Sequence, residues 1–207
     1  MARFHARLSA WKWQIRYEFP FALGIGRRNR PKSFRFGRFV MEDLGQPLPR
    51  PRPDRPDIYV WSIIDWHFRF QRPQHLAVGL ARRGHRVFYI SEAIDEGDEP
   101  GFSVEHVADG VVLVRLRTRA PASICDTAPS EADALGLAAS VGRLVAWANS
   151  TSCISVVQHP FWRRFAMPLP NGMVVADVLD LLTGFEGAGV AVAAEEDRLL
   201  RSAHLTV

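Results

Sequence analysis

The stretch WSIIDWHFRFQRPQHLAVGLARRGHRVFYIS, residues 61–91, determines the predicted fold. Two short β-rich runs, residues 57–64 and 85–91, flank a segment at 71–83 whose apolar residues recur at helical spacing. Gly84 follows that segment, and glycine is the residue that most often ends a helix. A strand, a helix and a second strand in this order form a βαβ unit, which requires a parallel sheet and a right-handed crossover.

Strand-like and helical patterns continue to alternate along the chain. Residues 102–107 and 110–117 predict a hairpin, and residues 130–149 predict a helix with Ser130 as its N-cap. The remaining predictions are strands at 153–159 and 173–180, a helix at 190–203 and a last strand at 204–207. This alternation predicts an α/β fold, a Rossmann-like parallel sheet between two layers of helices. In such sheets ligands bind outside the carboxyl ends of the strands, so the residues just after each strand are the ones to inspect.

The first 56 residues differ in composition from the rest. They hold 13 Lys and Arg against 4 Asp and Glu, whereas residues 57–207 hold 13 against 18. Residues 45–56 contain five prolines and predict an extended linker, which divides the chain into a leader at 1–44, the linker, and a domain at 57–207. Apolar spacing over residues 4–15 predicts a basic amphipathic helix in the leader. That helix would pack on a larger protein, lie on an anionic membrane surface or bind nucleic acid, and since no nucleic-acid-binding module accompanies it, nucleic acid is not expected as a partner.

Composition and missing motifs exclude several classes of protein. The chain is 47% hydrophobic and 23% charged, which is typical of a globular rather than a disordered or fibrous protein. No apolar run approaches the ~20 residues of a transmembrane helix, and no secretory signal is expected. Cys125 and Cys153 lack metal-ligand spacing and fit a cytoplasmic location with both thiols buried. No P-loop, G-x-S-x-G or G-x-G-x-x-G motif follows a strand, and no tight His and carboxylate spacing occurs, so neither a metal nor a cofactor is expected.

Three polar corners follow predicted strands and supply the candidate binding residues. They are Asp65, Trp66, His67, Arg69 and Arg72 in the first corner, His159 in the second, and Asp177, Asp180 and Glu186 in the third. The planar guanidinium groups of Arg69 and Arg72 suit phosphate or carboxylate, and Trp66 with Phe68 and Phe70 offers a platform for a sugar or a base.

Each corner also has a structural alternative. The arginines would pair with Asp65 or another carboxylate, the histidine would be a capped or surface group, and the aspartates would form turns or helix caps. From the residues alone, the sequence therefore predicts an α/β domain that binds an anion and a saccharide, with no catalytic residue assigned.

The segment that begins at Asp65 resembles the N-terminal half of glycosyltransferases of the GT-B type, in the family 1 and family 4-like bacterial branch that builds surface polysaccharides. That group has a W-x-F-x-x-Q-R-P-x-H-L loop and then an LA-x-x-G-H-x-V helix and strand. Both are matched here, by Trp66, Phe68, Gln71, Arg72, Pro73, His75, Leu76, Leu80, Ala81, Gly84, His85 and Val87. Similarity continues in VVQHPFW (156–162), VVADVLDLLTGFE (174–186) and AAEEDRLLRSAHLTV (193–207), so that it covers roughly residues 57–207. Ala176 stands where the group usually has Tyr.

The resemblance implies transfer of a sugar from a nucleotide-sugar donor to a saccharide or lipid-linked acceptor, in a cleft between two Rossmann domains. It further implies retention of stereochemistry and no essential metal. Arg69 and Arg72 would neutralise phosphate charge, and His159 would reach the sugar or its phosphate. Asp177 and Asp180 would line the acceptor side.

The group's donor-binding domain would follow Val207, so the chain is expected to be an incomplete enzyme and inactive by itself. The expected location is cytoplasmic, with peripheral attachment to the inner membrane face through residues 1–44 as a further expectation. Two alternatives stay open: a non-catalytic module that binds a saccharide or a partner, and a membrane-surface scaffold that works through the leader.

Overall fold

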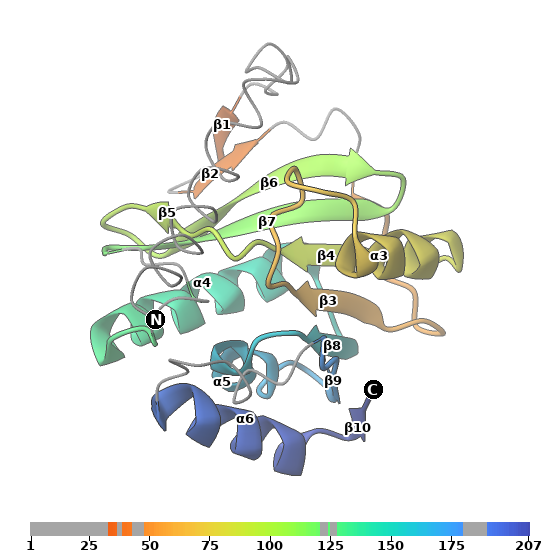
Figure 1. Cartoon of the computed structure of the whole chain (residues 1–207). Coiled ribbons are helices and arrows are strands. Elements are labelled where there is room, and N and C mark those ends of the chain that lie inside the picture. The colour runs from red at the N-terminus through yellow and green to blue at the C-terminus, as the bar shows by residue number, and fades with distance from the viewer. Residues whose placement is uncertain (1–32, 37–38, 43–47, 121–123, 125–127, 180–189) are drawn as a thin grey trace. The chain divides into compact units, whose positions relative to one another are not determined.

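The computed structural model describes residues 33–36, 39–42, 48–120, 124, 128–179 and 190–207 (Figure 1). The chain divides into two units, Met1–Lys32 and Ser33–Val207, and all of the described residues belong to the second. The elements in chain order are β1 (Ser33–Phe36), β2 (Phe39–Glu42), β3 (Asp57–Trp61), α3 (Arg72–Arg82), β4 (Val87–Ile90), β5 (Asp95–Glu96), β6 (Gly101–Ala108), β7 (Val111–Thr118), α4 (Glu131–Ala148), β8 (Cys153–Val157), the 3-10 helix η1 (Pro160–Trp162), α5 (Arg163–Ala166), β9 (Met173–Ala176), α6 (Val190–Ser202) and β10 (Leu205–Thr206).

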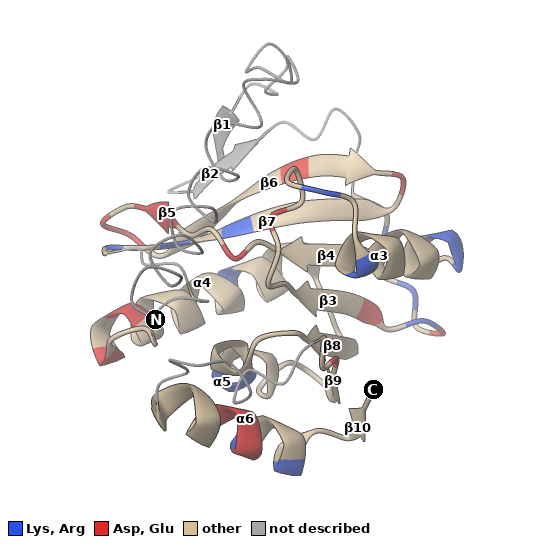
Figure 2. Ribbon diagram, viewed as in Figure 1, with Lys and Arg blue, Asp and Glu red and all other residues tan. Residues whose placement is uncertain are grey.

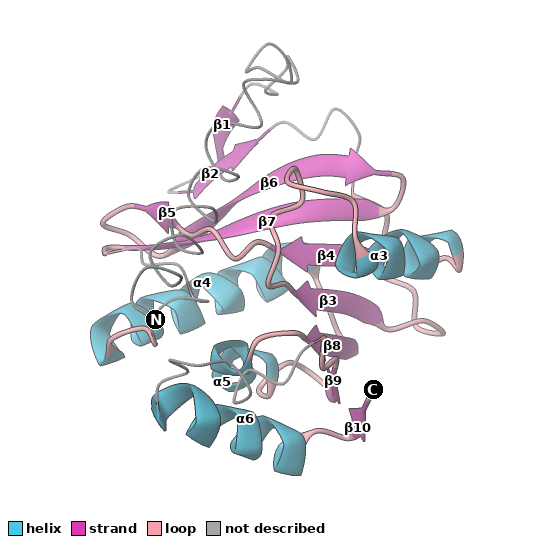
Figure 3. Ribbon diagram, in the orientation of Figure 1, coloured by secondary structure: helices cyan, strands magenta, loops and turns pink. Residues whose placement is uncertain are grey.

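The second unit is built on an eight-stranded sheet with the strand order β10-β9-β8-β3-β4-β7-β5, in which β6 pairs with β7. Every pair along this path is parallel, and the β6–β7 hairpin is antiparallel. A mostly parallel sheet with flanking helices (Figure 3) confirms the predicted Rossmann-like three-layer α/β fold. A separate two-stranded hairpin, β1–β2, lies within the residues predicted as leader.

The two faces of the sheet are buried by different helices. Successive side chains of a strand point to opposite faces, so Ile58 and Val60 of β3 pack with Ala77 of α3 in one hydrophobic cluster. Tyr59 and Trp61 face the other way and belong to a second cluster with residues of α4, α5 and α6. All five residues of β3 are buried, as expected for a central parallel strand covered on both faces.

Local sequence signals explain where the long elements begin and end. Ser130 caps α4 by accepting a hydrogen bond from the backbone N–H of Asp133, as predicted. Gly84 follows α3 with a φ of 87°, where a side chain would be strained and a Cβ would lie 2.7 Å from Nη1 of Arg55. Gly110 has a φ of 74° and closes the predicted hairpin between β6 and β7. These predictions are therefore confirmed to within a few residues.

Short elements account for the differences from the prediction. Strand β8 ends at Val157 and β9 at Ala176, two and four residues before their predicted ends. The structure also contains β5, η1, α5 and the β1–β2 hairpin, none of which was predicted. β5, η1 and α5 have only two to four residues and do not coincide with an apolar run of their own, so the sequence pattern did not indicate them.

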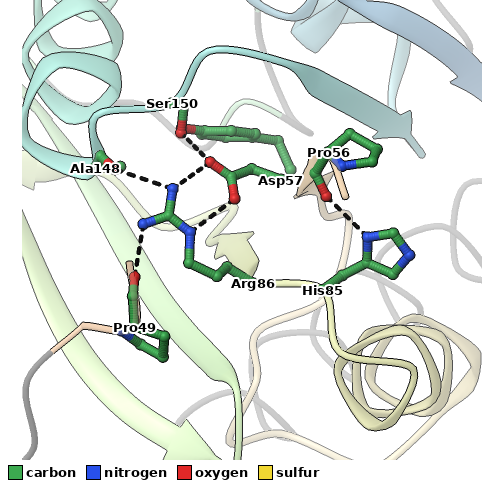
Figure 4. A network of polar contacts seen from close by, with 8 residues as sticks. Pro49, Pro56, Asp57, His85, Arg86, Ala148 and Ser150 are labelled. Atoms are coloured by element: carbon green, nitrogen blue, oxygen red, sulfur yellow. Dashed lines mark hydrogen bonds and ion pairs between the residues drawn. The ribbon is translucent and has the colours of Figure 1, made fainter. Parts of the chain in front are cut away.

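A buried ion pair joins the strands at the amino edge of the sheet (Figure 4). Asp57 and Arg86 form a bidentate pair, with Nε of Arg86 2.7 Å from Oδ1 of Asp57, and their side chains are only 4% and 7% exposed. Ser150 donates a hydrogen bond of 2.5 Å to the same carboxylate, and Arg86 also donates to the carbonyl oxygen of Ala148. The network links β3 and β4 to the C-terminal end of α4, so its role is structural.

Arg86 also attaches the described part of the predicted linker. It donates a 2.9 Å hydrogen bond to the carbonyl oxygen of Pro49, so this stretch is fixed to the sheet at that point. Cys153 lies nearby at the start of β8, and burial raises the pKa of its thiol to about 12, which keeps it protonated and unreactive. Cys125, the other thiol predicted to be buried, lies outside the described residues.

The topology places the ligand-binding edge between β3 and β8. From β3 the chain crosses through α3 to β4 on one side, whereas the later crossover through α4 leads to β8 on the other side. Crossovers that run in opposite directions place their helices on opposite faces, and in open α/β sheets ligands bind at the carboxyl ends of the strands where this reversal occurs.

Candidate functional site at the carboxyl edge of the sheet

Three strands end level with one another at this edge. Trp61 of β3 is in register with Val157 of β8, and Val157 is in register with Ala176 of β9. The next residues continue the ladder, because Gln158 N–H donates to the carbonyl oxygen of Trp61 and Asp177 N–H donates to that of Val157. The side chains that follow β8 and β9 are thereby fixed next to each other.

Asp177 connects three parts of the chain. Its carboxylate is fully buried, and Oδ1 accepts a 2.5 Å hydrogen bond from Nη2 of Arg72 at the start of α3. Oδ2 accepts a 2.9 Å hydrogen bond from Nε2 of Gln158. Arg72 itself is 55% exposed, so one end of its guanidinium group is held by Asp177 while the rest faces outward. The predicted pairing of an arginine in the first corner with a carboxylate is thus realised with Asp177.

Gln158 leaves a polar atom without a partner at this edge. The residue is 6% exposed, and its Oε1 has no hydrogen-bond partner among the described residues, whereas its Nε2 is oriented by Asp177. A buried acceptor that makes no hydrogen bond costs about 1–3 kcal/mol, so positions of this kind are often functional.

Gln74 holds the loop between β3 and α3. It is fully buried, and its Nε2 lies 2.7 Å from the carbonyl oxygen of Arg69 and 3.3 Å from that of Asp65. Its Oε1 accepts a 3.0 Å hydrogen bond from the backbone N–H of Gln71, the N-cap of α3. One side chain in the first turn of the helix therefore fixes both ends of the loop.

Asp65 and Trp66 also shape this loop. Oδ1 of Asp65 accepts a 2.8 Å hydrogen bond from the backbone N–H of His67, the arrangement of an Asx turn. Trp66 is 8% exposed and packs edge-on against Tyr89 of β4 at 5.0 Å between ring centroids. Because its ring is part of the hydrophobic core, Trp66 does not present a face for a sugar or a base in this structure.

The outer side of the loop carries exposed rings and positive charge. Phe68 is 37% exposed and Phe70 is 54% exposed, and the guanidinium of Arg69 lies 5.5 Å from the centre of the Phe68 ring. Nε2 of His67 lies 3.2 Å from Oε2 of Glu105 on β6, and this hydrogen bond raises the pKa of the histidine. Among the first-corner candidates, Arg72 contacts another predicted corner through Asp177, whereas His67 instead contacts β6.

The second corner is more enclosed than expected. His159 is 2% exposed and is the N-cap of η1, where its Nδ1 accepts a long 3.4 Å hydrogen bond from the backbone N–H of Phe161. A ligand would reach this ring only after neighbouring side chains moved. Asp180 and Glu186, two of the three candidates of the third corner, lie outside the described residues, and their roles stay predictions.

Two residues of the site were missed by sequence reasoning. Gln74 stands three residues after the N-cap Gln71, which is the spacing of a capping box and could have indicated its role. Gln158 begins the second polar corner but was not chosen as a candidate, and no sequence signal reveals that its Oε1 would lack a partner among the described residues.

Neither a family model nor a curated protein matches the chain. Within the described ranges, no group of three or more His, Cys, Asp and Glu is arranged to hold a metal ion. No helix among these residues is long and apolar enough to cross a membrane.

Proposed function

We propose that this chain forms the acceptor side of a sugar-transfer site, together with the near side of its phosphate subsite, in a glycosyltransferase of the GT-B type. The donor would be a nucleotide sugar, and the acceptor a saccharide or lipid-linked saccharide of cell-surface polysaccharide synthesis. The site would use no resident cofactor, and the location would be cytoplasmic.

The contact of Arg72 and Gln158 with the carboxylate of Asp177 carries this proposal. Arg72 and Asp177 are 105 positions apart, and Gln158 and Asp177 are 19 apart. Each of the three belongs to a separate segment that resembles the glycosyltransferase group. If the likeness of these short segments were due to chance, there would be no reason for them to meet at the edge where a Rossmann-like sheet binds its ligands.

Arg72 is the best-placed residue to act on the leaving group. Asp177 fixes the guanidinium at Nη2, so the outward N–H groups are oriented before a ligand arrives. Preoriented donors of this kind stabilise negative charge as it develops on a departing diphosphate. Asp177 is a positioning residue in this scheme because both of its oxygens already accept hydrogen bonds.

The two hydrogen bonds that Asp177 already accepts also favour the alternative function, a non-catalytic module that binds a saccharide or a partner. Asp177 is fully buried and doubly hydrogen-bonded, so it is poorly placed to accept a proton from a substrate hydroxyl. Attachment to the membrane through residues 1–44 also remains a proposal, which deletion of those residues would test.

Ligand-observed NMR on the full chain tests the proposed function. Wild type is titrated with a set of nucleoside diphosphates and nucleotide sugars, with inorganic phosphate as reference. We expect Arg72→Ala to weaken diphosphate binding by roughly 10- to 100-fold, because a hydrogen bond to a charged group contributes about 1.5–3 kcal/mol. Arg72→Lys keeps the charge but loses the planar fork, so its affinity for diphosphates should lie between those of wild type and Arg72→Ala.

Arg119→Gln is the matched control, since Arg119 is 79% exposed and only loosely paired, 3.8 Å from Asp98. Thermal melts of all three variants separate loss of binding from loss of folding. If wild type binds none of the diphosphates or nucleotide sugars, or if Arg72→Ala binds them as wild type does, the proposal fails. Transfer of a labelled sugar to an acceptor would separate the enzyme from the binding module.

A further inference from the structure

The outer side of α3 carries a row of basic and small residues. Arg72, His75, Gly79 and Arg82 are spaced by three or four positions, so they form one stripe along the helix. Arg72, His75 and Arg82 are all exposed, while the opposite side of the helix, which includes Ala77, is buried against the sheet. Figure 2 shows positive charge in the loop before α3 and at both ends of the helix.

Acidic residues are absent from this stretch. Residues 66–91 contain five arginines and no Asp or Glu. Of the arginines, Arg86 is buried in its ion pair with Asp57, which leaves the other four near the surface. Acidic residues that border the stripe include Asp177, which pairs with Arg72, and Glu105, which His67 engages. Asp109 lies at the tip of the β6–β7 hairpin, whose next residue, Gly110, packs near Ala81. Because Asp177 already pairs with Arg72, the positive charge on this side of the domain comes mainly from the exposed Arg69, Arg82 and Arg83.

Two exposed phenyl rings stand at the N-terminal end of this stripe. The ring of Phe70 packs edge-on against His75, with 4.6 Å between their centroids, and against Trp66 at 5.9 Å. Gln74 holds the carbonyl oxygens of the loop, so the loop cannot fold back to bury Phe68 and Phe70 without losing those hydrogen bonds. The exposure of the rings is thus enforced by the structure rather than left to a flexible loop.

We propose that Phe68, Phe70, Arg72, His75, Gly79 and Arg82 form a docking surface for an anionic membrane. Rings at the headgroup level and arginines along the same side are what a helix needs in order to lie on anionic lipid. Single-stranded nucleic acid also attracts arginines and aromatic rings, but its binding proteins supply a groove lined by successive rings. Here both rings stand at one end of an 11-residue convex helix, which fits a flat surface better.

This surface is distinct from the leader and does not depend on the proposed sugar transfer. It would bring the carboxyl edge of the sheet to the bilayer, because Arg72 belongs both to the stripe and to the contact with Asp177. A lipid-linked acceptor would then be met at the membrane surface.

Two glycines provide a matched test in the full chain. Gly79 lies in the stripe, and Gly142 lies on α4, which covers the opposite face of the sheet. A Cβ added at either glycine meets no atom within 4 Å, so Gly79→Glu and Gly142→Glu both begin in open space and add the same charge. Each protein is sedimented with vesicles of phosphatidylcholine alone and with vesicles that contain phosphatidylglycerol.

We expect wild type to bind the anionic vesicles, Gly79→Glu to bind them at least about fivefold more weakly, and Gly142→Glu to bind as wild type does. Phe68→Ser combined with Phe70→Ser should also weaken binding, and a cooperative thermal melt of this variant would show that it still folds. Equal affinities of the two glutamate variants for anionic vesicles would overturn the proposal. That result is expected if the chain binds through residues 1–44, because both variants would then weaken binding to the same extent. Absence of vesicle binding would overturn it as well, and binding of single-stranded RNA that only Gly79→Glu weakens would assign the surface to nucleic acid.

Discussion

Replacement of Gln74 by Leu should release the loop between β3 and α3. The glutamine side chain is fully buried and makes four polar contacts, with the carbonyl oxygens of Asp65, Trp66 and Arg69 and with the N–H of Gln71. Leu has a similar volume, so it should leave little cavity, and the change mainly removes hydrogen bonds. The perturbation therefore isolates the polar contribution of a single side chain to the loop.

The magnitude follows from the distances. The amide has two N–H groups, so the contacts at 2.7, 3.3 and 3.5 Å count as about two hydrogen bonds, and the contact with Gln71 at 3.0 Å is a third. At about 1 kcal/mol each, the expected loss is about 3 kcal/mol. For a protein of this size that corresponds to a fall in Tm of roughly 6–12 °C. Denaturant melts give the stability, and amide exchange of Gln71 reports the loop directly.

Gln74→Glu is the companion variant because it keeps the acceptor and removes the N–H donors. A buried carboxylate beside carbonyl oxygens has its pKa raised above the value of about 4.3 in the unfolded chain. Its stability should therefore approach that of wild type at low pH, where the carboxyl is protonated and can donate, and should fall as the pH rises through the raised pKa. A change of about 0.5 kcal/mol or less in the free energy of unfolding is typical of an ordinary surface substitution. If Gln74→Leu changes the free energy of unfolding by no more than this, and the amide exchange of Gln71 is unchanged, the reasoning about this loop is refuted.

Three further predictions concern the frame around the site. Asp57→Asn should lower the free energy of unfolding by about 3–5 kcal/mol in denaturant melts, because Arg86 stays buried without its carboxylate, and an unchanged value would show that the pair is not buried in solution. The hydrogen bond to Glu105 raises the pKa of His67. The pair is half-exposed, so it contributes less than about 1 kcal/mol to the free energy of unfolding. This contribution is complete below about pH 6.5 and is lost as the pH rises through the raised pKa. Glu105→Gln should accordingly destabilise the chain more at about pH 5.5 than at about pH 8.5, and a loss that does not vary with pH would contradict the contact. Gly142→Ala should stabilise the protein by about 0.5–1 kcal/mol, since it lies in the interior of α4 with free space for a Cβ, and a lower melting temperature would count against the helix there.

Much of the fold follows from local patterns. The βαβ unit around α3 could be predicted because each strand is an apolar run and Gly84 marks the end of the helix. Helix α4 could be predicted from Ser130 and an apolar period sustained over 18 residues. Both signals lie within a few turns of chain, which is why they can be read without tertiary structure.

The site could be predicted only in part, since its geometry depends on contacts between distant residues. The corners at the ends of β3, β8 and β9 were located because parallel strands end at one edge of the sheet. The partner of Arg72 could not be chosen from the sequence, where Asp65 is seven positions away and Asp177 is 105 away. Burial likewise decides that Trp66 packs in the core while Phe70 is exposed, and two aromatic residues four positions apart look alike in a sequence.

One loop therefore performs two separable tasks, which explains why its sequence is so crowded. On its inner side, Gln74 and the Arg72–Asp177 contact fix the carboxyl edge of the sheet. On its outer side, the same fixed backbone holds Phe68 and Phe70 in solvent. Loss of Gln74 should impair both tasks, whereas Gly79→Glu should impair only the outer one, because no atom of the inner site contacts the position of its Cβ. Binding of a nucleoside diphosphate that survives Gly79→Glu but not Gln74→Leu would separate the two tasks in one protein.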